Sequence, residues 1–331
     1  MANLIVKLEN CITIGFMNQD DRPENTFQPV LASVLGILFV STASILIRFA
    51  QAEASSIVIS AARLLIASLV LVPIALLRFR HEFSMLAKSE ILKACLSGLF
   101  LALHFALWIS SLQFTSVASS VVLVTTTPLW VAILSPLILK ESIRPSVIVG
   151  LVVSIIGGVI VGLGNSCEIS GGNFVCQDAL FSDEGMFGNL LALMGAWMAA
   201  GYMLMGRQLR KKLSTIPYTA LVYGVAAVIL LVVVIMRREP VFSYSPEIYG
   251  WLLALGILPQ LLGHTLFNWS LKYVSAAYVS LSLLGEPIGT IILAFIFLEE
   301  SPTLLEGAGA FLILIGIVIG SLGRARKVNA A

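Results

Sequence analysis

Long apolar runs recur along the whole of this 331-residue chain, and they constrain its fold more than any other feature. An α-helix rises about 1.5 Å per residue, so about 20 apolar residues cross the hydrocarbon core of a bilayer. Hydrophobic residues make up 58% of the chain and charged residues 11%, which is too little charge to cover a soluble surface. The sequence therefore predicts an all-α polytopic membrane protein.

The runs predict ten transmembrane helices, joined by several short connections that make consecutive helices antiparallel neighbours. The predicted helices cover residues 30–50, 56–78, 93–112, 116–138, 146–164, 187–208, 217–236, 249–270, 274–298 and 303–322. Residues 1–29 and 323–331 are expected to form tails. The apolar piece "LIV" near the start is too short for a cleaved signal peptide.

Lysine and arginine indicate the orientation, because they favour the cytoplasmic side of a membrane. With the N-terminus inside, sixteen of the twenty fall in cytoplasmic segments, and the external loops keep only Arg237 and Arg238. Both termini are therefore predicted to be cytoplasmic. Because no organelle-targeting prefix is evident, we expect a bacterial plasma (inner) membrane.

The longest internal loop, residues 165–186, is predicted to lie outside the cell and contains Cys167 and Cys176. Two cysteines in an oxidising compartment, separated by a stretch with a Gly-Gly turn, can form a disulfide bond. The alternative is a pair of free surface thiols. Cys11, in the N-terminal tail, and Cys95, in a predicted helix, are not expected to pair.

The second half of the chain repeats the first. A shift of 159 positions superposes Pro128 on Pro287, together with a series of small, apolar and acidic residues. Five helices per half is an odd number, so the second half must cross the membrane in the opposite direction. We therefore predict two inverted five-helix repeats, 30–164 and 187–322. This organisation is typical of secondary transporters with a substrate site near the midplane.

Two equivalent stretches share a small-residue start, a mid-helix proline and a closing Leu-x-Glu. They read "SVASSVVLVTTTPLWVAILSPLILKESIRP" and "VSAAYVSLSLLGEPIGTIILAFIFLEESPT". They resemble the paired EamA domains of the drug/metabolite transporter superfamily, of the ten-helix exporter type, and the resemblance covers about residues 30–322. It implies a carrier without ATPase machinery, with a central cavity and export of amino acids or related metabolites. The chain departs from the family in reading Leu-Lys-Glu and Leu-Glu-Glu, where Leu-Gly-Glu is common.

Glu286 and Pro287 lie together in an apolar run, where a carboxylate facing lipid would be costly. Ser282 and Glu286 share one helix face, so this face is predicted to point into the protein. Pro287, like Pro128 in the first repeat, removes a backbone donor and loosens its helix near the midplane. Glu286 either binds a substrate ammonium or exchanges a proton during transport, or it is the structural partner of an arginine.

Arg63 lies about eight residues into its predicted helix, too deep for its side chain to reach water comfortably by snorkelling. It needs a partner, which is Glu286, a helix-end carbonyl or a substrate carboxylate. An arginine recurs at this place in the family that the chain resembles, which favours a structural anchor. Arg48, the other arginine that could pair with Glu286, lies nearer the surface and is expected to anchor its helix at the interface.

Other polar and aromatic residues are substrate-site candidates, although packing is the commoner role for each one taken alone. They are His104, Trp108, Trp130, Trp197, Tyr202, Gln260, His264 and Asn268. Gln260, His264 and Asn268 are spaced four apart and share a face of a helix that Pro259 is expected to loosen. Aromatic and amide groups around a cavity suit a small zwitterion or an aromatic compound.

The sequence carries no motif expected of a membrane enzyme or an ATP-driven pump. HExxH, GxSxG and P-loop patterns are absent, and the three histidines do not suggest a metal site. We expect no cofactor, metal or nucleic acid; the expected partners are the bilayer and a small-molecule substrate. The alternatives are a nucleotide-sugar or other phosphorylated-metabolite exchanger, which clustered lysines inside the spans would favour, and an integral membrane enzyme.

The last helix of each half carries a GxxxG spacing, Gly158–Gly162 and Gly316–Gly320. Such spacings let helices approach closely in lipid, where no hydrophobic drive holds them together. The glycines either pack within the fold, which we favour, or form a dimer, so the chain is expected to be a monomer or homodimer.

Overall fold

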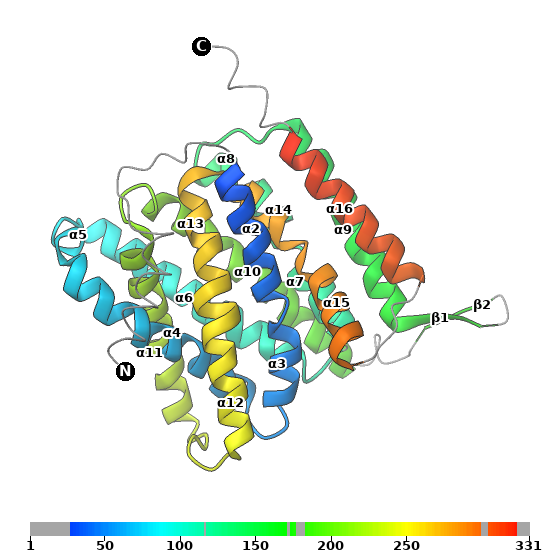
Figure 1. The fold of residues 1–331 in the computed structure, drawn as a ribbon, viewed down its shortest axis with the longest axis horizontal. Helices are drawn as coiled ribbons and strands as arrows, with labels where there is room; N and C mark the ends of the chain where they lie inside the picture. Colours follow the sequence, from blue (N-terminus) through cyan, green and yellow to red (C-terminus); the bar gives the residue numbers. More distant parts are fainter. Residues whose placement is uncertain (1–26, 116, 171–172, 177–182, 299–303, 323–331) are drawn as a thin grey trace.

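The computed structural model describes residues 27–115, 117–170, 173–176, 183–298 and 304–322 (Figure 1). Helices occupy the ranges in which the apolar runs predict them, with ends that differ by a few residues. In the first half they are α2 (Phe27–Val40), α3 (Ala43–Ala50), α4 (Ser56–Arg78), α5 (Arg80–Ser84), α6 (Lys88–Ser111), α7 (Val117–Val124), α8 (Thr127–Ile138) and α9 (Pro145–Ser166). In the second half they are α10 (Asp183–Leu209), α11 (Thr215–Met236), α12 (Pro246–Leu255), the π-helical η2 (Gly256–His264), α13 (Thr265–Tyr273), α14 (Ala276–Leu283), α15 (Glu286–Leu298) and α16 (Leu304–Leu322).

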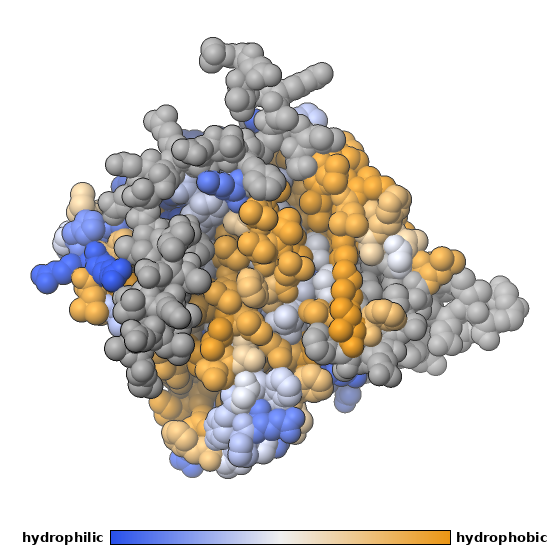
Figure 2. All heavy atoms as spheres, in the orientation of Figure 1, coloured by the Kyte–Doolittle hydropathy of each residue, from blue (hydrophilic) through white to orange (hydrophobic). Residues whose placement is uncertain are grey.

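Six stretches of the described residues are long and apolar enough to cross a membrane. They are Gln28–Ala50, Ser56–Arg78, Lys88–Ser111, Glu184–Leu209, Thr215–Met236 and Pro246–Tyr273. Figure 2 shows apolar residues over most of the middle of one face, with hydrophilic residues gathered around α5 and at the lower end of α12. An apolar belt between polar ends is the surface expected of a membrane protein.

Three of the predicted spans are broken near their middle. The breaks separate α2 from α3, α7 from α8 and α14 from α15. The second and third lie just before Pro128 and Pro287, as expected from the missing backbone donors. The first contains no proline and departs from the prediction of one continuous helix over 30–50. A further departure is η2, which contains Pro259 and is wound as a π-helix instead of an α-helix.

The helix bounds of the two halves recur at the spacing found in the sequence. Adding 159 to the bounds of α7, 117–124, gives those of α14, 276–283, and the starts of α4 and α11 are related in the same way. The halves also interlock, because α2 packs on η2 and α13 while α10 packs on α6. Helices from both halves therefore surround the centre of the molecule.

α9 and α16 lie side by side at one edge of the molecule (Figure 1). A Cβ added to Gly157 would lie 2.6 Å from the carbonyl oxygen of Gly309, and one on Gly150 would collide with that of Gly316. The pairing of low numbers on one helix with high numbers on the other makes the helices antiparallel. Close backbone approach between small residues is the usual source of attraction between helices in lipid.

Equivalent positions of the two halves meet in this contact. The Ser154 hydroxyl donates to the carbonyl oxygen of Ile313 at 3.3 Å, and these residues are 159 positions apart. Gly316 and Gly320 pack against α9, as the prediction of packing within the fold requires. The prediction is wrong for Gly158, which has nothing within 4 Å of an added Cβ because it faces away from α16.

Replacing Gly157 by alanine should lower the melting temperature of the detergent-purified protein. The added methyl group meets backbone atoms of α16, which cannot move aside like a flexible side chain, and overpacking of this kind costs about 1–3 kcal/mol. Gly158→Ala is the matched control, because it adds the same group one residue away into open space. Equal melting temperatures for the two variants would contradict the close α9–α16 contact.

A short hairpin follows α9, where the sequence analysis expected only a loop. Its strands are β1 (Cys167–Ser170) and β2 (Asn173–Cys176), and their antiparallel register places Cys167 directly opposite Cys176. Cys95 is free, as expected, and Cys11 lies outside the described residues.

We predict that Cys167 and Cys176 are disulfide-bonded in protein made with its loop in an oxidising compartment. Directly opposed residues of an antiparallel pair have Cα atoms about 4.5–5.5 Å apart, which lies within the range that a disulfide bridges. Non-reducing peptide mass mapping should recover the two cysteines in one linked peptide. Recovery of both as free thiols would refute the bond.

Candidate functional site

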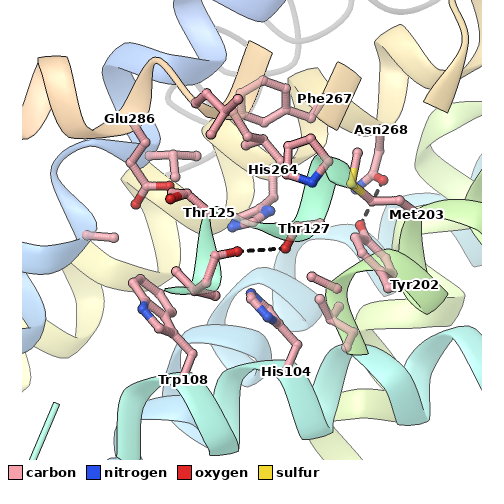
Figure 3. Close-up of a pocket in the computed structure, with 18 of the residues that line it drawn as sticks. His104, Trp108, Thr125, Thr127, Tyr202, Met203, His264, Phe267, Asn268 and Glu286 are labelled. Carbon is pink, nitrogen blue, oxygen red and sulfur yellow. Dashed lines mark hydrogen bonds between the residues drawn. The ribbon is translucent and has the colours of Figure 1, made fainter. Parts of the chain in front are cut away.

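A cavity of about 70 Å³ lies where the three helix breaks meet. Its lining comes from both halves of the chain, and it brings together most of the candidates found in the sequence. Those that line it are Arg63, His104, Trp108, Pro128, Tyr202, His264, Asn268 and Glu286. Figure 3 shows Glu286 and Trp108 on one side of the cavity and Tyr202 and Asn268 on the other.

The break between α7 and α8 follows from the missing N–H of Pro128. The carbonyl oxygen of Val124 loses its helical donor, and the hydroxyl of Thr127 donates to it instead at 2.8 Å. The hydroxyl of Thr126 likewise donates to Leu123 O at 2.6 Å. The Thr127 hydroxyl thus replaces the missing backbone donor, and Leu123 O also accepts from the backbone N–H of Thr126 at 3.1 Å, so neither carbonyl is left unpaired.

The equivalent break before Pro287 places Glu286 at the first position of α15. Leu284 and Gly285 donate to carbonyls three residues earlier, at 3.1 and 3.0 Å, so the end of α14 is tightened into a 3₁₀-like turn. A helix N-terminus carries a partial positive charge, which stabilises a carboxylate in the first turn. The break therefore places Glu286 at the cavity. The partial positive charge at the start of α15 offsets part of the free energy that taking its carboxylate out of water costs.

The break between α2 and α3 depends on two hydroxyl groups that the sequence analysis missed. Ser41 Oγ donates to Ile37 O at 2.7 Å and to Glu286 O at 3.1 Å, while Thr42 Oγ1 donates to Phe39 O at 2.7 Å. Thr290 Oγ1 donates to Ser41 O at 3.2 Å, so this break is fastened to the start of α15. Adjacent Ser and Thr in an apolar run compete for helix carbonyls, which is the signal that could have revealed it.

Arg63 is completely buried and is held on two sides. Its Nε donates to Gln260 Oε1 at 3.0 Å, and its guanidinium carbon lies 3.9 Å from the centre of the Phe105 ring. Nη1 and Nη2 have no hydrogen-bond partner among the described residues. Within the described part of the chain, no ion pair within 4.0 Å joins Arg63 to Glu286, and Arg48 is exposed. Among the described residues, the second of the three alternative partners, a helix-end carbonyl, is not found either.

Two histidines, His104 and His264, line the cavity together with Arg63. His104 Nδ1 lies 3.0 Å from the carbonyl oxygen of Gly195 and therefore carries the proton that it donates there. The His104 ring stacks on Trp108 with centroids 6.0 Å apart, and His264 meets the Phe105 ring edge-on at 5.4 Å. Trp108 Nε1 is buried without a hydrogen-bond partner among the described residues.

A hydrogen-bonded chain forms another wall of the cavity. Tyr202 Oη donates to Asn268 Oδ1 at 2.7 Å, and Asn268 Nδ2 donates to Tyr223 Oη at 3.0 Å. All three side chains are buried. Tyr223 is not a sequence candidate, and only its tertiary contact with α13 reveals its role in fixing the orientation of Asn268.

Four of the polar and aromatic candidates do not line the cavity, and neither do Pro259 and Pro287. Trp130 and Trp197 pack edge-to-face with centroids 5.3 Å apart, and Trp197 is 40% exposed on the outer surface. Ser282 is buried and donates back to Tyr278 O at 3.1 Å, as helical serines often do. Gln260 is buried behind the cavity, where it supports Arg63.

An ion-pair cluster that was not among the sequence candidates is bonded to the backbone of Leu271, a residue whose side chain lines the cavity. Arg207 Nε donates to Glu141 Oε1 at 3.0 Å, and Lys211 Nζ lies 3.8 Å from the same oxygen. Arg207 Nη1 donates to Leu271 O at 2.6 Å, and the Leu271 side chain lines the cavity. The cluster joins the end of α8 to the ends of α10 and α13. Glu300, the repeat equivalent of Glu141, lies outside the described residues.

We predict that this cluster closes one end of the cavity, so that Glu141→Gln makes the cavity more accessible. A partly exposed charged pair contributes about 1 kcal/mol, so the open population should rise about fivefold. We would measure the rate at which maleimide labels Met203→Cys in the cavity, in a background with the native cysteines replaced by serine. Glu239→Gln is the control, because its pair with Arg237 lies in a loop. Equal labelling rates would contradict a closing role.

Comparison with known proteins identifies the family. The model of the EamA-like transporter family matches residues 28–163 and again residues 186–322. The chain belongs to this family. The two matches confirm the resemblance to the drug/metabolite transporter superfamily and give the chain two copies of one domain.

Curated relatives of the chain are named as transporters. It is 23% identical over 68% of its length to an uncharacterized transporter of Archaeoglobus fulgidus, of which the match covers 73%. It is 28% identical over 65% of its length to the uncharacterized transporter YyaM of Bacillus subtilis, of which 68% is covered. A solved crystal structure, 19% identical, superposes with a TM-score of 0.72 over 92% of this chain and 100% of that chain, which shows a shared fold. The chain is therefore an integral membrane transporter.

Proposed function

We propose that this EamA-like transporter is a secondary carrier that exports small metabolites, such as amino acids or amines, by alternating access around the central cavity. The observation that carries the proposal is the cavity itself, which lies where breaks from both domain copies meet and is lined by the buried guanidinium of Arg63 and the partly buried side chain of Glu286. Discontinuous helices of two repeats commonly form the substrate site of such carriers.

The proposed topology has ten spans in two inverted five-helix repeats, with both termini cytoplasmic in a bacterial plasma membrane. The recurrence of helix bounds at 159 residues and the antiparallel contact of α9 with α16 support the inversion. The distribution of lysine and arginine supports the orientation. The ion-pair cluster around Glu141 and Arg207 then lies at the cytoplasmic end, and the structure represents a state closed on that side.

The small size of the cavity favours a small substrate. A volume of about 70 Å³ is small beside the clefts of about 300–1,000 Å³ that hold most small-molecule ligands, so we expect the cavity to widen when a metabolite enters. The alternative, a nucleotide-sugar or phosphorylated-metabolite exchanger, needs cations for several phosphate charges. No lysine lies among the described residues that line the cavity, and Arg63 is its single arginine.

Liposomes containing the purified protein should release preloaded radiolabelled leucine, phenylalanine or a small amine faster than empty liposomes. Unlabelled substrate on the opposite side should accelerate exchange of the label, because an alternating-access carrier returns faster when loaded, whereas a channel shows no such effect. UDP-glucose should not exchange. Release of none of these metabolites would count against the carrier function, and exchange of UDP-glucose alone would favour the alternative.

Glu286→Gln should reduce transport of ammonium-bearing substrates about tenfold or more, because it removes the negative charge of the cavity while keeping the side-chain shape. Ser282→Ala is the matched control, since Ser282 lies one turn away but bonds only to its own helix. Thermal-shift measurements with the same ligands would separate binding from coupling. Unchanged transport in Glu286→Gln would return this residue to a structural role.

A further inference from the structure

We propose that Arg63 binds the carboxylate group of the transported molecule, so that the substrate class is a small metabolite carrying one carboxylate. This inference rests on the proposed function and deepens it. It assigns the recognition of the substrate to a residue for which the sequence analysis favoured a structural anchor. It also separates carboxylate-bearing metabolites from plain amines, which the proposed function leaves together.

The first step is the fixed orientation of the guanidinium. Nε is occupied by Gln260, and one face of the group lies over the Phe105 ring. These contacts leave the edge formed by Nη1 and Nη2 free, and the Arg63 side chain lines the cavity. Two parallel N–H donors at the edge of a rigid planar group match the two oxygens of a carboxylate.

The second step is the chemistry of the unpaired atoms. Of the described residues that line the cavity, those with buried side-chain atoms lacking a hydrogen-bond partner are Arg63, through Nη1 and Nη2, and Trp108, through Nε1. All three atoms are donors. An unpaired buried donor costs free energy, and a cationic one costs more. A ligand that supplies acceptor oxygens removes this cost, whereas a ligand that offers only donors does not.

The third step is charge balance. Glu286 lines the same cavity but makes no ion pair with Arg63 within 4.0 Å, so neither side chain occupies the other's binding groups. One arginine suits a single carboxylate better than a phosphate dianion, which Glu286 would repel. A plain amine would leave Arg63 unpaired and place a second cation beside it. The cavity therefore favours ligands that carry a carboxylate, and Glu286 determines which other charged or polar group the ligand can carry.

The test compares ligands that share a side chain and differ only at the carboxylate. Leucine, leucinamide and isoamylamine are one such set, and phenylalanine, phenylalaninamide and phenethylamine are another. Ligands that bind the folded protein stabilise it by mass action, so thermal shifts over a concentration series report relative affinity. We expect the acids to stabilise the wild-type protein, and the amides and amines to need at least about tenfold more ligand for the same shift.

Arg63→Lys keeps the positive charge but loses the planar fork, so it should weaken the preference for acid over amide. Gln260→Ala should weaken the response to the acids by less, because it frees the guanidinium without removing it. The ligand comparison on the wild-type protein needs no variant, so it decides the matter even if Arg63→Lys fails to fold.

Equal shifts for acid, amide and amine, no shift with either acid, or an unchanged acid preference in Arg63→Lys would overturn the inference. The liposome exchange experiment distinguishes a failure of this inference from a failure of the proposed carrier function. Counterflow of leucine and phenylalanine that is insensitive to Arg63→Lys would leave the carrier intact and remove the carboxylate site. Absence of counterflow with every ligand would remove the carrier function itself.

Discussion

A lipid-facing backbone must satisfy its own hydrogen bonds, and the arrangement of this molecule depends on that constraint. A helix can be interrupted at membrane depth only where other groups pair with the freed carbonyls. The three breaks meet at one cavity, and hydroxyl groups of Thr127, Ser41 and Thr42 donate to carbonyls beside them. The breaks are thus confined to the interior, and the residues that they turn inward become the lining of the site.

The two domain copies give the cavity a symmetric frame, and its charges break that symmetry. A shift of 159 positions relates Glu286 to Thr127, and both line the cavity at the start of a half-helix. The same shift relates Arg63 to Val222, which is apolar and buried. Duplication of one domain can explain the equivalent helix breaks around the cavity. It cannot explain why equivalent positions carry different charges. Recognition of a charged substrate therefore depends on the positions at which the copies differ.

Much of this could be predicted from sequence, because apolar runs, prolines and the repeat are local or periodic signals. Pro128 and Pro287 predicted breaks that the structure contains. The Arg63–Gln260 contact could not be predicted, since it joins residues 197 positions apart and depends on how α4 packs against η2. Trp197 shows the opposite failure: its place in the middle of an apolar run made it a candidate for the substrate site, yet it does not line the cavity and its side chain is 40% exposed.

In the proposed alternating-access cycle, the supports of Arg63 would connect substrate binding to the movement of the two domain copies. Phe105 belongs to the first copy and Gln260 to the second, so the guanidinium is held between them. Rocking of one copy against the other changes the distance between these supports and thereby the direction of Nη1 and Nη2. A ligand can shift a conformational equilibrium only through unequal affinity for its states. A carboxylate that completes the coordination of Arg63 in one arrangement of the copies, and not in the other, supplies that inequality.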